Sequence, residues 1–309
     1  MRRKLRDYLA VQWAQNPSRM DPVLSRLVAE ELISQQDAID IRRRLKIPAK
    51  TVIEPSAWFY WNVHLDGLEA SHDRSVERPG VFKECILAIR LAKHLGFQVA
   101  TNTTVFRETQ MAEIEDLFVF LGSLGVDGHT LSPGYDFDAA KQDMVKRLKR
   151  RPEEFFLTRA ATVDKFWYVE EWSRRFPLLG TPVYFEFLAG KRNLTCSAWA
   201  IPTRNVRGWR SPCYLIADTH CSSYAELLAT TDWSRYGTLD GKAQDPRCEH
   251  CMVHCGYEPS ASLGIGARRG DMLKNIRFNF GPRPRVKIHP VNAFRPKTEA
   301  AVFELSGKP

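Results

Sequence analysis

No cysteine precedes Cys85 in this chain of 309 residues, and the first 50 residues contain no glycine. That segment can therefore supply neither a thiolate metal site nor a glycine-rich phosphate loop. Runs of eighteen apolar residues are also missing, so no membrane-spanning helix is predicted. Residues 1–13 are basic and amphipathic but lack a signal-peptide core and cleavage site, which favours a cytoplasmic location.

The composition indicates a folded and basic protein. Hydrophobic residues make up 44% of the chain, enough for a sizeable core, and the length suggests two domains or one barrel with an appendage. The formal net charge is +9. Because no nucleic-acid-binding motif accompanies this charge, we expect no nucleic-acid partner. Peripheral contact with anionic lipid at the inner membrane face is the better expectation.

Strand-like and helix-like segments alternate over the first half of the chain. Glycines at 96 and 125 are placed as the C-terminal caps of two amphipathic helices. This alternation predicts parallel βαβ units and an α/β fold. The predicted strands are 58–64, 97–106 and 126–132, and the predicted helices are 81–95 and 111–124. Residues 139–180 are expected to be helical, and residues 183–188 to form a short strand.

Six of the seven cysteines lie after position 195. Cys248, Cys251 and Cys255 form a C-x2-C-x3-C run, and Cys196 and Cys213 frame Gly208 in a C-x11-G-x4-C pattern. We expect these five thiols to meet at one metal centre. Their spacing alone suits an iron–sulfur cluster or zinc about equally, and His250 and His254 could also serve zinc. Cys85 is expected to be a buried core thiol, and Cys221 a spare.

The strand ending Val63-His-Leu-Asp-Gly67, followed by His72-Asp73, Gly80 and Phe82, resembles a pattern of radical S-adenosylmethionine (SAM) barrels. From about residue 51 to 256 the chain is similar to the adenosyl hopene transferase family of hopanoid biosynthesis. The shared words include Trp61–Gly67, Thr101–Thr104, Gly125–Gly128, Ser132–Tyr135, Pro202–Val206, Gly208–Trp209, Pro212–Tyr214, Thr231–Trp233, Tyr236–Gly237 and Cys251–Glu258.

The resemblance implies a domain organisation and a chemistry. A partial radical-SAM-type (β/α) barrel would span residues 51–189, and a cysteine-rich auxiliary-cluster-like module residues 190–260. Residues 1–50 would be a non-family helical segment, and residues 261–309 a basic, loosely ordered tail. The implied cofactors are a [4Fe–4S] cluster and SAM. The implied reaction adds a 5′-deoxyadenosyl radical to a hopanoid lipid, diploptene, to form adenosylhopane.

The resemblance also implies cofactor-binding residues at the carboxyl ends of barrel strands. His64, Asp66 and Asn102 would face SAM, with Asp66 on the ribose. The family holds its SAM-cleaving cluster on a C-x3-C-x2-C motif near the N-terminus, and this chain has no such motif. We therefore expect weak or no SAM cleavage by this chain alone. We also expect residues 1–50 to cover the open side of strand 58–64.

Two other interpretations stay open. The chain could be a truncated, catalytically inactive remnant that only binds an iron–sulfur cluster, or an unrelated basic module with a zinc knuckle. On purely local grounds, Asp66-Gly67 is also a common turn pair, and His72-Asp73 could simply bond the entry of a helix.

Overall fold

The computed structural model describes residues 55–137 and 151–282, with positions 28, 29, 35, 145, 146 and 149 in addition. Almost all of the N-terminal segment predicted to be helical lies outside the described residues, and so does the tail from 283 on. The expected covering role of residues 1–50 therefore stays a prediction. Within the described part, no helix is long and apolar enough to cross a bilayer.

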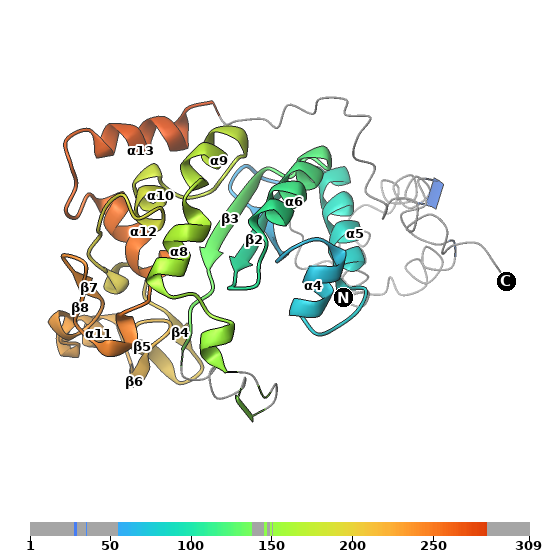
Figure 1. Cartoon of the computed structure of the whole chain (residues 1–309). Helices are drawn as coiled ribbons and strands as arrows, with labels where there is room; N and C mark the ends of the chain where they lie inside the picture. Colours follow the sequence, from blue (N-terminus) through green and yellow to red (C-terminus); the bar gives the residue numbers. More distant parts are fainter. Residues whose placement is uncertain are drawn as a thin grey trace.

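The first half of the chain forms a parallel sheet, as predicted. Its strand order is β1-β2-β3, and both pairings are parallel. The described part is thus α/β with an open three-stranded sheet, and these residues close no barrel (Figure 1). The elements are β1 (Tyr60–His64), α4 (Glu69–Ser75), α5 (Val81–His94), β2 (Gln98–Val105), α6 (Met111–Ser123) and β3 (Gly128–Pro133).

The outer edge of β3 is covered by a neighbouring loop. The amide of His129 donates to the carbonyl of Pro177 at 3.0 Å, and the amide of Leu179 donates to the carbonyl of His129 at 2.8 Å. On the other side of the sheet, β1 pairs with β2 alone among the described strands. Just before β1, Trp58 is 96% exposed.

Local sequence explains how the helices of this half begin and end. The carboxylate of Asp73 accepts hydrogen bonds from the amides of Gly80 and, at 2.8 Å, Phe82, so it caps the first turn of α5. Asp73 therefore does bond a helix entry, whereas His72 Nδ1 accepts from the amide of Asp66 at 3.2 Å. Gly96 and Gly125 follow α5 and α6 with φ of 84° and 76°, the left-handed conformation predicted for helix-ending glycines.

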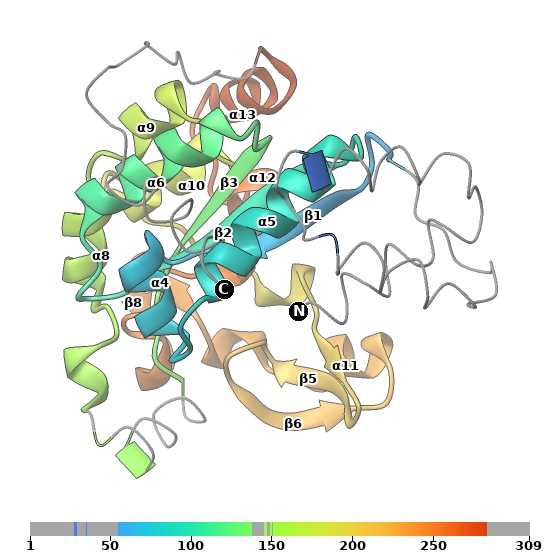
Figure 2. The ribbon, with the colours of Figure 1, turned by 90° about the vertical axis from the view of Figure 1, so that its right-hand side faces the viewer.

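The second half is a helical layer followed by a small irregular module (Figure 2). In the module, β4, β5 and β6 form an antiparallel sheet, and β7 and β8 a short hairpin. The helical elements are η2 (Pro152–Glu154), α8 (Arg159–Phe166), α9 (Val169–Arg175), α10 (Pro182–Leu188), η3 (Ala198–Ala200), α11 (Tyr224–Thr230), η4 (Trp233–Arg235), η5 (Pro246–Cys248), α12 (His254–Leu263) and α13 (Asp271–Phe280). The strands are β4 (Arg204–Asn205), β5 (Gly208–Pro212), β6 (Ala217–Cys221), β7 (Thr238–Leu239) and β8 (Lys242–Ala243).

Two predictions for this half were wrong. The expected strand 183–188 is helix α10, because Thr181 caps it by accepting from the amide of Tyr184 at 3.2 Å and Pro182 occupies its first turn. The tail expected to be loosely ordered, residues 261–309, contains the end of α12 and all of α13, and its part after residue 282 lies outside the described residues. Helix α13 is held by the ion pair between Asp271 and the buried Arg192 (2.8 Å).

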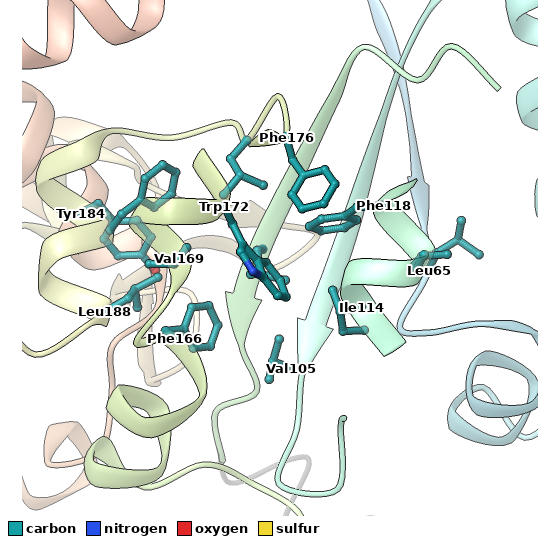
Figure 3. Close-up of a cluster of buried hydrophobic side chains, with 14 of the residues drawn as sticks. Leu65, Val105, Ile114, Phe118, Phe166, Val169, Trp172, Phe176, Tyr184 and Leu188 are labelled. Carbon is teal, nitrogen blue, oxygen red and sulfur yellow. The ribbon is translucent and has the colours of Figure 1, made fainter. Parts of the chain in front are cut away.

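One hydrophobic core joins the sheet to the helical layer (Figure 3). Phe118 of α6 stacks on the ring of His129 in β3, with centroids 4.2 Å apart. It also meets Trp172 and Phe176 edge-on at 6.0 and 5.5 Å. These contacts fix α9 against β3, and α10 packs in turn on α8, α9, α12 and α13.

Candidate metal centre

Five cysteines from three separate segments line one cavity. Cys196 precedes η3, Cys213 follows β5, and Cys248, Cys251 and Cys255 lie between η5 and the first turn of α12. The cavity measures about 70 Å³. The five cysteines predicted to share a metal centre therefore line the same cavity, while the metal centre itself stays a prediction. A single water needs only about 10–15 Å³ on this measure, so the cavity could hold more than one.

Backbone hydrogen bonds fix the segments that carry these cysteines. The amide of Cys196 donates to the carbonyl of Thr238 at 3.1 Å, and the amide of Cys213 to that of Ile216 at 3.2 Å. The hydroxyl of Thr238 also bonds the Tyr257 hydroxyl at 2.9 Å, which ties β7 to α12. At the surface, Arg247 bonds Asp218 at 2.6 and 3.0 Å and so joins β6 to the turn that carries Cys248.

Two glycines pack directly against Cys196. A Cβ at Gly237 would lie 2.4 Å from the Cβ of Cys196, and a Cβ at Gly256 would lie 2.7 Å from its Sγ. Real side chains essentially never approach so closely. Any residue other than glycine at either position would therefore displace the Cys196 thiol from the cavity wall.

Backbone amides point at the sulfur atoms. The amide of Gly237 donates to Cys248 Sγ at 3.2 Å, and the amide of Ile216 donates to Cys213 Sγ at 3.3 Å. The amides of Ala198 and Val253 act on Cys196 and Cys251 in the same sense, since each lowers the pKa of its thiol. Such amide–sulfur bonds stabilise thiolates and tune the potential of iron–sulfur clusters.

Burial nevertheless keeps these groups protonated as free thiols. It raises the pKa of Cys196 and of Cys255 to about 12 and that of Cys248 to about 11. The pKa values of Cys213 and Cys251 are raised for the same reason. A metal that binds here must release protons from the thiols, so its binding should weaken as the pH falls.

The described cysteines do not form a preformed site for a metal ion. Among the described residues, no group of three or more His, Cys, Asp or Glu side chains is arranged to hold a metal ion. Neither His250 nor His254 lines the cavity, and His254 bonds the Ser132 hydroxyl of β3 at 3.1 Å instead.

Aromatic side chains form much of the remaining wall, and sequence reasoning missed them. They are Tyr135, Trp199, Trp233, Tyr236 and Tyr257. Tyr135 follows β3, so the cavity lies next to the carboxyl end of that strand. The short sequence segments that resemble the family already contained most of these aromatic residues. Five of those segments contribute to the cavity wall: Ser132–Tyr135, Pro212–Tyr214, Thr231–Trp233, Tyr236–Gly237 and Cys251–Glu258.

Comparison with protein families gives a match to the second half of the described chain. A family model described as a domain of unknown function (DUF3463) matches residues 129–274. The match covers slightly less than half of the chain, runs from β3 into α13, and includes all five cavity cysteines. No curated protein matches the chain.

The predicted SAM-facing residues lie outside the matched region but close to one another. His64 Nε2 lies 2.7 Å from Asp66 Oδ2, and Asn102 Nδ2 lies 3.4 Å from His64 Nδ1. The buried Asp66 carboxylate also accepts from the Thr104 amide at 2.8 Å and the Ser75 hydroxyl at 3.3 Å. Asp66 is thus engaged on both oxygens within the fold, whereas the side chain of His64 is 45% exposed.

The remaining cysteines lie away from the cavity. Cys85 is buried on α5 within the hydrophobic core, where burial raises its pKa to about 11. Cys221, at the end of β6, is buried beside the Thr230 hydroxyl at 3.8 Å. Neither thiol lines the cavity, in line with the roles expected for them.

Proposed function

We propose that the cysteine cavity binds a [4Fe–4S] cluster and that the chain is a radical SAM family protein of hopanoid biosynthesis. One observation carries the first part: five thiols from three segments line a single cavity of about 70 Å³. Thiolate ligands suit both iron–sulfur clusters and zinc. Zinc on the same thiols is the alternative. The C-x11-G-x4-C pattern and the resemblance to an auxiliary-cluster module favour the cluster.

The residues of the cavity would serve such a cluster in three ways. Four of the five thiols would bind iron, and the amides of Gly237 and Ile216 would hold charge on Cys248 and Cys213. The aromatic wall would exclude water from the sulfur atoms. When bound, a cluster of this type supplies electron transfer.

The hopanoid part of the proposal rests on the short sequence segments that resemble the adenosyl hopene transferase family and that surround the cavity. Words that lie far apart in the chain converge on one place in the fold, which supports a shared site. If the family reaction applies, a hopanoid alkene would be the substrate, and SAM the source of the adenosyl group. Of the three residues predicted to face SAM, His64 and Asn102 have side chains with enough exposed surface for a ribose to reach.

A cluster-binding protein without SAM chemistry is the second candidate. The arrangement around Asp66 favours it, because this carboxylate already holds the ends of β1 and β2 together. The one cysteine described near this edge is Cys85, whose Sγ contacts the carbonyl of His64 at 3.9 Å from within the core. We therefore expect this chain alone to form 5′-deoxyadenosine weakly or not at all.

Anaerobic reconstitution with iron and sulfide tests the cluster. We expect a brown protein with about four irons per chain. Replacing Cys248, Cys251 and Cys255 together by Ser should abolish the colour. Cys221→Ser, which alters a buried thiol of the same module outside the cavity, should retain it. A colourless protein that carries stoichiometric zinc would overturn the proposal.

A further inference from the structure

Helix α13 turns its polar side toward the protein and its apolar side toward solvent. Asp271 pairs with the buried Arg192, and Asn275 Nδ2 donates to the carbonyl of Ala261 at 2.9 Å. On the opposite side, Leu273 is 70% and Phe280 85% exposed. At 3.6 residues per turn, the apolar residues form one stripe about 100° wide. The stripe consists of Met272, Leu273, Ile276 and Phe280.

Basic side chains border this stripe. Arg268 and Arg269 lie in the loop before α13, and Arg277 lies on its flank; all three are exposed. In the described part of the chain no carboxylate forms an ion pair with any of these three arginines, whereas Lys274 pairs with Glu186. The face therefore combines exposed apolar surface with uncompensated positive charge.

Helices α13 and α9 lie at the outside of the helical layer (Figure 1). Residues of both helices and of the loop 177–182 line a groove. It encloses about 510 Å³. Arg174 and Arg277 supply cationic groups to it, and Leu179 and Phe278 supply apolar surface. The charges of Glu170 and Lys274, which also line it, are balanced by ion pairs with Lys191 and Glu186. An anionic headgroup with the start of an acyl chain matches both kinds of lining.

We propose that α13 and this groove dock on the surface of an anionic lipid bilayer. The stripe would enter the boundary between headgroups and acyl chains, while the arginines bind the anionic headgroups. The positive charge favours an anionic bilayer over a purely apolar partner, because such a partner would leave Arg268, Arg269 and Arg277 without counter-charge. Because Asp271 and Asn275 anchor the helix from behind, its outward face is preformed. This surface goes beyond the proposed cluster function.

Vesicle co-sedimentation of the full chain, purified without iron, tests the surface independently of the cluster. We expect binding to phosphatidylglycerol vesicles and little to phosphatidylcholine vesicles. The double variant Leu273→Glu/Ile276→Glu should weaken binding at least tenfold. Val206→Glu alters a fully exposed apolar residue in the turn between β4 and β5 and should bind as the parent does. Arg268→Ala/Arg269→Ala should reduce binding about fivefold for each arginine.

A variant that leaves the fold unchanged gives a direct readout. Phe280→Trp places an indole on the stripe, and in vesicles with brominated acyl chains its fluorescence should be quenched. Equal binding to both vesicle types, or unchanged binding of the Leu273→Glu/Ile276→Glu variant, would overturn the proposal. So would absent vesicle binding together with a dimer that this variant dissociates, because the stripe would then pair two copies of the chain.

Discussion

Glu258, in α12 behind the cysteine cavity, should make the folded protein less stable as the pH rises. Its Oε2 atom is buried and has no hydrogen-bond partner among the described residues. Burial raises the pKa of this carboxyl from 4.5 to about 7, although hydrogen bonds from Thr181 act in the opposite direction. Below about pH 4.5 the group is protonated in both states and contributes no difference in stability. Above about pH 7 it must be ionised in a buried site.

The magnitude follows from these two pKa values. At about 1.4 kcal/mol for each pKa unit, the folded protein loses about 3 kcal/mol between pH 4.5 and 7. Glu258→Gln removes the titration, so its stability relative to the parent should rise by about that amount from pH 5 to pH 8. Urea unfolding in reductant without metal measures it, with the exposed Glu171→Gln on α9 as the control. A stability difference that is equal at both pH values would refute the reasoning.

Three further substitutions test other contacts. Asp271→Asn should cost about 2 kcal/mol, because it removes one of the two carboxylates that pair with the buried Arg192 and leaves Glu186 at 3.1 Å. It should also speed amide exchange in α13, and protection equal to the parent would contradict this. Asp73→Ala should cost about 1 kcal/mol in urea unfolding by uncapping α5, and no loss would show that solvent replaces the cap. Asp66→Asn should lower the pKa of His64, which the bond to Asp66 raises, as an NMR titration would show. The stability from that pair is present below about pH 6.5 and is lost as the pH rises through the raised pKa.

Structural features that depend on residues close together in the chain were predictable. The β1-β2-β3 unit follows from alternating periodicity and from Gly96 and Gly125, which end helices by local geometry. Helix α10 was not predictable in this way, because its residues are almost all buried and show no alternation between an inner and an outer face. Helix α13 depends on Arg192, about 80 residues earlier in the chain, and such a partner leaves no local pattern.

In the candidate site, too, features set by residues close in the chain were predictable, and contacts between distant segments were not. Cysteine spacing predicted that the five cysteines would lie together, because three of them fall within eight residues, and all five line one cavity. The closeness of Gly237 and Gly256 to Cys196 is a contact between distant segments, and spacing carries no information about it. Asp66 shows the converse. Its place at a strand end was predictable, but its bonds to Thr104 and Ser75 depend on how β2 and α4 approach.

The two edge strands of the parallel sheet differ in how far their outer backbone groups are already hydrogen-bonded. At β3, the loop around Leu178 already occupies the outward amide and carbonyl of His129. At β1, none of the described strands lies on the outer side. Among the described residues, the edge beside Tyr60–His64 is therefore the one at which a further parallel strand could pair along its whole length. Such a strand would end beside His64 and would thereby set the far wall of the polar edge that His64 and Asn102 begin.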